Sequence, residues 1–262
     1  YADNPSPTNR SIYVAKFSPD GNFLWGKTIC SNSIWNDVRA TMITSFNNNL
    51  YIAGYFEEEF YFAEDTLTSL GDMNLFLLKM DNEGTELWAR QAECIMDLES
   101  FTEIDTDNEG NCYLCGNFTG ELSFDTITVT GNDEDLFIAK YNENGDIQWL
   151  KYAGSEPHTD QVNDLCVDPS GNVFITGKFW NSATFGSTTI TVPNGTYNMF
   201  LAKYDTDGAF QWVQNIGNSN LESGQAICSD SLSNIYIIGN YEDSISLGSN
   251  SIYTVGGGSF LT

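Results

Sequence analysis

The stretch 198–217 recurs, with substitutions, three more times upstream in this 262-residue sequence. It carries Lys203, Gly208 and Trp212 in that order. The other copies keep the order and run through Lys16, Gly21 and Trp25, through Lys79, Gly84 and Trp88, and through Lys140, Gly145 and Trp149. Because the four lysines follow one another at 63, 61 and 63 residues, the sequence describes a repeat protein, and its period has to be explained before any other feature.

Each copy of this phrase predicts two β-strands joined by a tight turn. An apolar, β-branched or aromatic run precedes the turn, as in residues 136–139, and the tryptophan alternates with polar residues after it, as in residues 147–150. The turn, as in residues 205–208, begins with short side chains that accept hydrogen bonds from the turn's N–H groups and ends with a glycine that tolerates positive φ. A second strand-like phrase closes on Gly54, Gly116, Gly177 and Gly239. With a further strand candidate ahead of each closing glycine, one period holds four short strands.

Four short strands in a period of about 62 residues predict an all-β fold, namely a β-propeller built from four-stranded antiparallel blades. Tandem immunoglobulin-like domains need about 100 residues each, and β-helix coils have much shorter periods. The four repeated tryptophans are expected to be wedges between blades, with a binding platform as the alternative. They are Trp25, Trp88, Trp149 and Trp212.

The period divides residues 1–262 into parts of one propeller region. The predicted parts are a partial blade at 11–32, blades at about 33–94, 95–154 and 155–217, and a partial blade at 218–262. Because the last residues match the middle of a strand in the other copies, we expect an incomplete part of a larger propeller within a longer chain.

The two phrases resemble the bacterial seven-bladed β-propeller repeat (SBBP-type) family. The matching residues are Phe200, Lys203, Tyr204, Asp205, Gly208 and Trp212 in one phrase, and Asp168, Gly171, Asn172, Phe174, Gly177 and Phe179 in the other. The resemblance implies a module of a secreted or cell-surface bacterial protein and brings no shared catalytic residues. The sequence departs from the pattern where Ser45 and Phe46 replace the Asp-containing turn and where Ser233 replaces the glycine before Asn234.

The net charge of −26, from 36 acids and 10 basic residues, sets limits on partners. Such a surface repels phosphate backbones and anionic membranes, so nucleic acid is not an expected partner. The sequence has no apolar run of 18 residues, so no membrane insertion is expected, and residues 1–10 show no signal-peptide pattern. The acidic surface is interpreted as a well-hydrated one, with attraction of calcium or other cations as the alternative.

The six cysteines do not predict a disulfide framework. Cys166 and Cys228 hold the same repeat position, and equivalent positions on neighbouring blades are usually too far apart for a disulfide. Cys112 and Cys115 have CxxC spacing but lie within a predicted strand, where residues three apart point to opposite faces. The cysteines are therefore expected to be small core residues, with zinc or redox chemistry as the alternative for the CxxC pair.

An acid stands 17 residues before each closing glycine, at Asp37, Glu99, Asp160 and Glu222. These positions enter the predicted innermost strands, so the four carboxylates are candidate ligand-binding residues that could ring one mouth of a central channel. The alternative is that each carboxylate accepts hydrogen bonds from loop N–H groups within its own blade.

Asp105, Asp107 and Glu109 resemble the start of a calcium loop, with oxygen ligands at alternate positions and Gly110 for the bend. No bidentate Glu occupies the twelfth position, so calcium is the alternative and an Asp-capped hairpin turn is the main expectation. No other cofactor is expected.

An enzyme is not the expected function. His158 is the only histidine, and no Ser or Cys nucleophile motif accompanies it. We expect a non-enzymatic propeller module that binds a protein or glycan partner outside the cell or on its surface. Two alternatives stay open, namely a propeller-fold glycan hydrolase that uses paired carboxylates and a structural spacer in a large adhesin.

Overall fold

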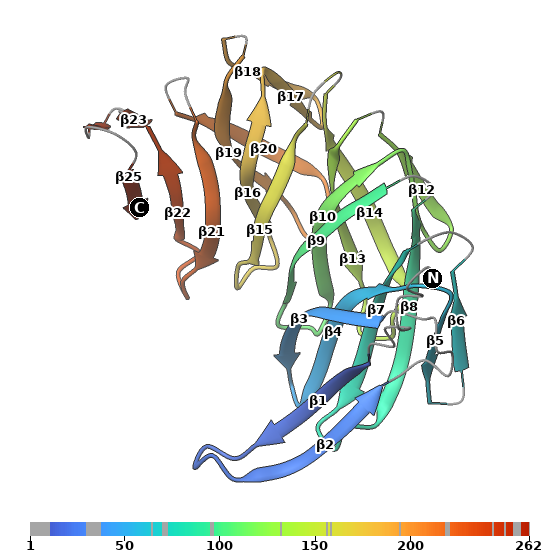
Figure 1. Ribbon diagram of the computed structural model, residues 1–262. Coiled ribbons are helices and arrows are strands. Elements are labelled where there is room, and N and C mark those ends of the chain that lie inside the picture. Colours follow the sequence, from blue (N-terminus) through green and yellow to red (C-terminus); the bar gives the residue numbers. More distant parts are fainter. Residues whose placement is uncertain are drawn as a thin grey trace, which may run out of the picture. The chain divides into compact units, whose positions relative to one another are not determined.

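The computed structural model describes most of the chain as antiparallel β-strands (Figure 1). It describes residues 11–29, 38–63, 65–69, 73–94, 97–131, 133–155, 157, 159–193, 195–217, 221–242, 244–248, 250–253 and 258–261. The chain divides into two compact units, Tyr1–Ile95 and Met96–Thr262, which are taken one at a time below. Within the described residues there are strands and turns but no helix, as the sequence predicts.

Unit 1 contains two hairpins and a four-stranded sheet. Its strands are β1 (Ile12–Phe17), β2 (Phe23–Ile29), β3 (Val38–Phe46), β4 (Asn49–Phe56), β5 (Glu59–Phe62), β6 (Asp65–Thr68), β7 (Asn74–Asp81) and β8 (Glu86–Cys94). Strands β3, β4, β7 and β8 pair antiparallel in that order. The β1–β2 hairpin repeats the β7–β8 pairing, since Lys16 lies opposite Trp25 as Lys79 lies opposite Trp88.

Unit 2 contains three sheets of the same kind. Sheet 1 consists of β9 (Asp97–Thr106), β10 (Cys112–Thr119), β13 (Asp135–Tyr141) and β14 (Ile147–Gly154), paired in that order. Sheet 2 consists of β15 (Gln161–Val167), β16 (Val173–Trp180), β19 (Tyr197–Tyr204) and β20 (Phe210–Ile216). Sheet 3 consists of β21 (Ser223–Ser229), β22 (Ile235–Tyr241) and β25 (Gly258–Leu261).

Small hairpins stand between the second and third strands of these sheets, at the aromatic and threonine-rich segments. In unit 2 they are β11 (Glu121–Phe124) with β12 (Ile127–Thr130), β17 (Ser182–Phe185) with β18 (Thr188–Thr191), and β23 (Ser244–Leu247) with β24 (Asn250–Tyr253). Strand β17 also pairs with β14 of sheet 1. The β17–β18 hairpin, which lies between strands β16 and β19 of sheet 2 in the sequence, therefore hydrogen-bonds to sheet 1.

The hairpin turns have the chemistry that the sequence predicts. Gly171 has a φ of 81° and donates its N–H to the Asp168 carbonyl at 2.8 Å, while Asp168 donates its N–H to the Asn172 carbonyl at 2.9 Å. The departures from the pattern adopt the same backbone, because Ser233 has a φ of 63° and the turn after Phe46 uses Asn47 and Asn48 at positive φ.

Apolar faces of neighbouring sheets in unit 2 pack into core clusters, one between sheets 1 and 2 and another between sheets 2 and 3. Trp149 of sheet 1 is 7 % exposed and packs in a cluster with Phe200 and Tyr204 of sheet 2. This position confirms for Trp149 the predicted place between two sheets. The clusters exclude water from large aromatic side chains, and burial of such surface is the main stabilising contribution in a β-protein of this kind.

The cysteines in the described part of the chain are free thiols. Cys112, Cys115 and Cys166 are buried, and burial raises the pKa of the Cys166 thiol above its usual range. In the described ranges, no helix has the length and apolar character needed to cross a membrane.

Candidate functional site

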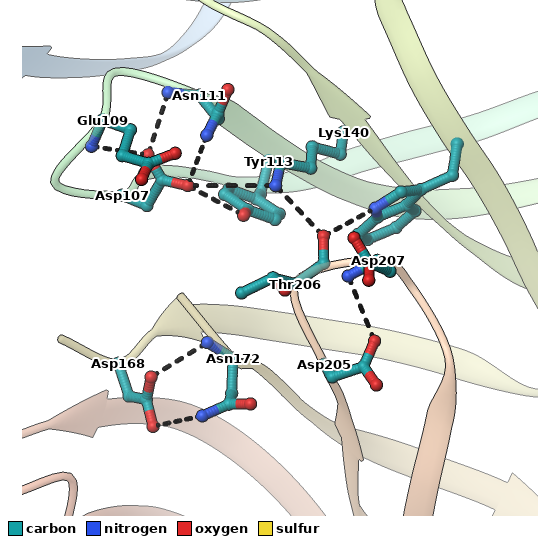
Figure 2. Close-up of polar contacts among 11 residues, drawn as sticks. Asp107, Glu109, Asn111, Tyr113, Lys140, Asp168, Asn172, Asp205, Thr206 and Asp207 are labelled. Carbon is teal, nitrogen blue, oxygen red and sulfur yellow. Dashed lines mark hydrogen bonds and ion pairs between the residues drawn. The ribbon is translucent and has the colours of Figure 1, made fainter. Parts of the chain in front are cut away.

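Three hairpin turns of unit 2 surround a polar cleft of about 300 Å³ (Figure 2). The β9–β10 turn contributes Asp107 and Glu109, the β15–β16 turn contributes residues 169–171, and the β19–β20 turn contributes Thr206 and Asp207. The three turns belong to two neighbouring sheets, sheet 1 and sheet 2, and they lie far apart from one another in the sequence. The repeat therefore places two equivalent turns, β9–β10 and β15–β16, beside the β19–β20 turn at this cleft.

A second cleft of about 200 Å³ shares Asp107 and Pro169 with the first. It extends the polar surface to Asp168 and to Asp230 in the β21–β22 turn of sheet 3. The two adjoining clefts are called the rim cleft below.

Asp107 is the most completely bonded carboxylate of the rim cleft and is 8 % exposed. Its Oδ1 accepts hydrogen bonds from the N–H groups of Glu109 at 2.9 Å and Asn111 at 3.0 Å. Its Oδ2 accepts from Asn111 Nδ2 at 2.7 Å and from the Tyr113 hydroxyl at 2.9 Å, and it lies 4.0 Å from Lys140 Nζ (Figure 2). These contacts fix the turn, as short acceptor side chains do in Asx-type turns.

The other turns repeat part of this arrangement. Asp168 Oδ1 accepts from the N–H groups of Ser170 and Asn172, both at 2.9 Å, and its Oδ2 accepts from Asn172 Nδ2 at 2.9 Å. Asp205 Oδ1 accepts from the Asp207 N–H at 3.1 Å. Each first Asp therefore holds its own turn, whereas Glu109 and Asp207 are exposed.

Lys140 and Trp149 connect the cleft to the core. Lys140 Nζ donates to the Thr206 carbonyl at 3.0 Å (Figure 2). Trp149 Nε1 donates to the same oxygen at 3.1 Å. Lys140 Nζ also lies 5.0 Å from the centre of the Tyr113 ring. The lysine charge is therefore shared between an aromatic face, a carbonyl and a carboxylate.

The rim cleft offers hydrogen-bond acceptors on turns that are held by their own hydrogen bonds. Exposed carboxylates at Glu109 and Asp207 can accept from hydroxyl or ammonium groups, and such charge-assisted hydrogen bonds are stronger than neutral ones. The backbone of residues 169–171 adds peptide groups to the same surface.

The predicted calcium residues separate in the structure. Asp105 Oδ2 accepts from the Val167 N–H of the neighbouring sheet at 2.9 Å, and its Oδ1 accepts from the Thr106 N–H at 2.7 Å. Asp107 holds its turn, and Glu109 is exposed. Over the described residues, no group of three or more His, Cys, Asp or Glu side chains is arranged to hold a metal ion. The Asp107 bonds are those of the expected Asp-capped turn, and calcium at this loop stays the untested alternative.

The predicted ring of acids can be followed at two of its four positions. Asp160 is 0 % exposed and its Oδ1 accepts from the Trp180 N–H of its own sheet at 3.0 Å, and Glu222 is 1 % exposed. The Asp160 contact is the one expected under the alternative in which a carboxylate is bonded within its own blade, and the ring as a ligand-binding site stays a prediction. Asp37 lies outside the described residues, as does the side chain of Glu99 in β9.

Burial raises the pKa of Asp160 to about 8, and the neighbouring acids Asp135 and Glu134 add to the effect. Asp160 Oδ2 is buried without a hydrogen-bond partner. An acid in this setting holds its proton near neutral pH. His158, the only histidine of the sequence, lies outside the described residues.

A different set of acids lies on the innermost strands. Asp164 Oδ2 accepts from the Ile227 N–H of sheet 3 at 2.6 Å, as Asp105 does from Val167 of sheet 2. Burial raises the pKa of Asp164 to about 6 and also raises the pKa of Glu103 and of Asp105. The sequence analysis missed Glu103 and Asp164, although the alternation of acids at 103 and 105 was a signal for one polar face of a strand.

Comparisons with known proteins support the fold. Residues 148–178 match the model of a beta-propeller repeat named SBBP. A relative, the "Uncharacterized WD repeat-containing protein L264" of Acanthamoeba polyphaga mimivirus, is 31 % identical over 153 residues, which cover 49 % of this chain and 11 % of the relative. The chain thus spans a small part of that relative's length. Residues 148–178 are a beta-propeller repeat of the SBBP type, and the all-β chain that carries them has a β-propeller fold.

Proposed function

We propose that this chain is a non-enzymatic β-propeller module that binds a protein or glycan partner through the rim cleft. The observation that carries the proposal is the cleft of about 300 Å³ built from three Asp-rich turns. The turns are held by their own hydrogen bonds, so the exposed carboxylates of Glu109 and Asp207 stand on a preformed surface. A preformed site loses less conformational entropy when it binds.

The charge of the chain sets the chemistry of the partner. With a net charge of −26, the surface favours partners that present ammonium groups or many hydroxyl donors. Such partners meet the module outside the cell or on its surface, which is the location we propose.

A glycan array followed by calorimetry tests the proposal. The purified chain is compared with the double variant E109Q/D207N, which removes two exposed carboxylates and leaves the turn bonds of Asp107 and Asp205 in place. We expect the variant to bind at least tenfold more weakly, about 1.4 kcal/mol. Glu121, an exposed acid that does not line the cleft, provides the control E121Q.

The same array distinguishes binding from catalysis. Retained glycans that are recovered intact support a binding module, whereas released fragments would favour a hydrolase. Equal binding by the native chain and the E109Q/D207N variant would contradict the proposal that the partner binds at the rim cleft.

A further inference from the structure

The repeated lysine and tryptophan form a pair of donors to a single carbonyl. In unit 2, Lys140 Nζ and Trp149 Nε1 both donate to Thr206 O, at 3.0 and 3.1 Å. In unit 1, Lys16 Nζ and Trp25 Nε1 both donate to Asn82 O, at 3.1 and 3.0 Å. In both units the acceptor is the second residue of a β-hairpin turn that begins one repeat later in the sequence.

Lys203 and Trp212 of sheet 2 repeat the donor geometry. Lys203 Nζ lies 5.2 Å from the centre of the Phe174 ring, and the Phe174 and Trp212 rings meet edge to face at 6.0 Å. The corresponding distances around Tyr113 are 5.0 Å to Lys140 Nζ and 5.9 Å to the Trp149 ring. Lys203 and Trp212 are therefore arranged on sheet 2 as Lys140 and Trp149 are arranged on sheet 1.

No described residue accepts a hydrogen bond from Lys203 Nζ or Trp212 Nε1, and Trp212 is half-buried where Trp149 is 7 % exposed. An indole N–H and a lysine ammonium are donors only, so each needs an acceptor when it is covered. Lys203 Nζ and Trp212 Nε1 therefore mark a part of the sheet surface that can bind a carbonyl oxygen.

An established interface continues into this open part. On the same sheet, Asp164 Oδ2 accepts from the Ile227 N–H of sheet 3 at 2.6 Å, and Asn163 Nδ2 donates to the Gly224 carbonyl at 2.6 Å. Phe174, between these contacts and the donors, is 3 % exposed and belongs to a core cluster that includes Ile227. The surface is thus covered over its inner strands and open at Lys203 and Trp212.

We propose that the open part is a docking site for the turn of a further β-hairpin of the same repeat, whose second turn residue presents a main-chain carbonyl to Lys203 Nζ and Trp212 Nε1. The partner is recognised by backbone shape and by one main-chain carbonyl, which is the contact that the two acceptors already present, Thr206 and Asn82, have in common. The side chain at that position can add to the contact, since Lys16 Nζ also donates to Asn82 Oδ1.

Hydrogen exchange of the indole N–H groups, followed by NMR, compares the bonded indole of Trp149 with the indole of Trp212 in one molecule. The Trp149 indole is bonded and should exchange at least tenfold more slowly than that of Trp212. A variant W212F assigns the Trp212 signal by its loss.

A chain extended after Thr262 with a copy of residues 203–217 supplies the proposed hairpin. The extension should slow exchange at Trp212 at least tenfold, leave Trp149 unchanged and raise the melting temperature. In the extended chain, K203M should remove most of the gain in melting temperature, whereas K140M should lower the melting temperature equally with and without the extension.

Two outcomes would overturn the proposal. In one, the extension leaves Trp212 exchange unchanged or stabilises the K203M variant as much as the native chain. In the other, Trp212 is already protected in the unextended chain and the protection falls on dilution, which would show that a second copy covers the surface.

Discussion

Asp107 and Asp230 make the same hydrogen bonds in two different surroundings. Asp230 Oδ1 accepts from the N–H groups of Leu232 at 2.8 Å and Asn234 at 2.9 Å, and its Oδ2 accepts from Asn234 Nδ2 at 2.8 Å and from the Tyr236 hydroxyl at 3.2 Å. Asp107 makes the equivalent four bonds two repeats earlier. The sequence pattern is shared, so any difference between the two sites comes from what covers them.

The covering differs at the tyrosine. Tyr113 is 0 % exposed, whereas Tyr236 is 41 % exposed. Hydrogen bonds from Asn234 hold the pKa of Asp230 below its usual range. Burial raises the pKa of Tyr113, so that hydroxyl stays a donor to Asp107. A turn motif thus becomes part of the core only where a neighbouring sheet encloses it.

Replacement of Asp107 by alanine should show the largest effect. D107A leaves the buried Tyr113 hydroxyl and the Lys140 ammonium without their carboxylate, which costs about 3 kcal/mol. D230A removes the same bonds where water can replace them, so its cost should be clearly smaller than that of D107A. Denaturant unfolding of both variants measures the difference, and equal losses would show that enclosure contributes nothing to this motif.

Asp160 extends the comparison to a carboxyl group with no exposure. The pKa of Asp160 is about 8 in the folded chain and 3.8 in the unfolded chain. The stability that its bound proton confers on the folded chain is therefore complete below pH 4 and is lost as the pH rises towards 8. We expect the native chain to lose about 2 kcal/mol relative to D160N between pH 5 and pH 7. Parallel stability curves for the two proteins over this range would contradict the assignment of a buried, protonated Asp160.

Asp164 provides an intermediate case. Burial raises its pKa to about 6, while the Ile227 N–H favours the charged form. The stability that its proton confers is complete below pH 4 and is lost by about pH 6, and solvent screening reduces the effect to about 1 kcal/mol. Unfolding of D164N and the native chain at pH 4 and pH 7 measures it. A loss that continues above pH 7 would belong to another group.

The sequence predicts the parts of this fold that depend on local chemistry. The Asp and Gly spacing predicts the hairpin turns, and the regular period predicts four-stranded sheets, because both follow from neighbouring residues. The place of Trp149 follows from its size. At Ser233 the sequence shows only a departure from glycine, and the structure adds that the backbone keeps positive φ there.

Other features depend on what a distant repeat brings near. Nothing local distinguishes Asp105, which bonds Val167 of the next sheet, from a calcium-loop acid. Nothing local shows that Asp160 is buried between acids. The rim cleft also escapes sequence analysis, since its three turns are defined by the approach of two sheets. Burial and interface contacts are therefore the information that the structure adds.

The turn of Asp230 also allows the finest test of the comparison. Ser233 holds a φ of 63°, a conformation in which the equivalent Gly171 has a φ of 81°. A side chain costs about 1 kcal/mol in this region, so S233G should stabilise the chain by somewhat less than that, since glycine also gains freedom in the unfolded state. Gly21 offers the reverse control, because it has a φ of 80° and a Cβ added there meets no atom within 4 Å. G21S should therefore lower the free energy of unfolding by about as much as S233G raises it. A G21S variant that is more stable than the native chain would show that backbone strain does not govern these turns.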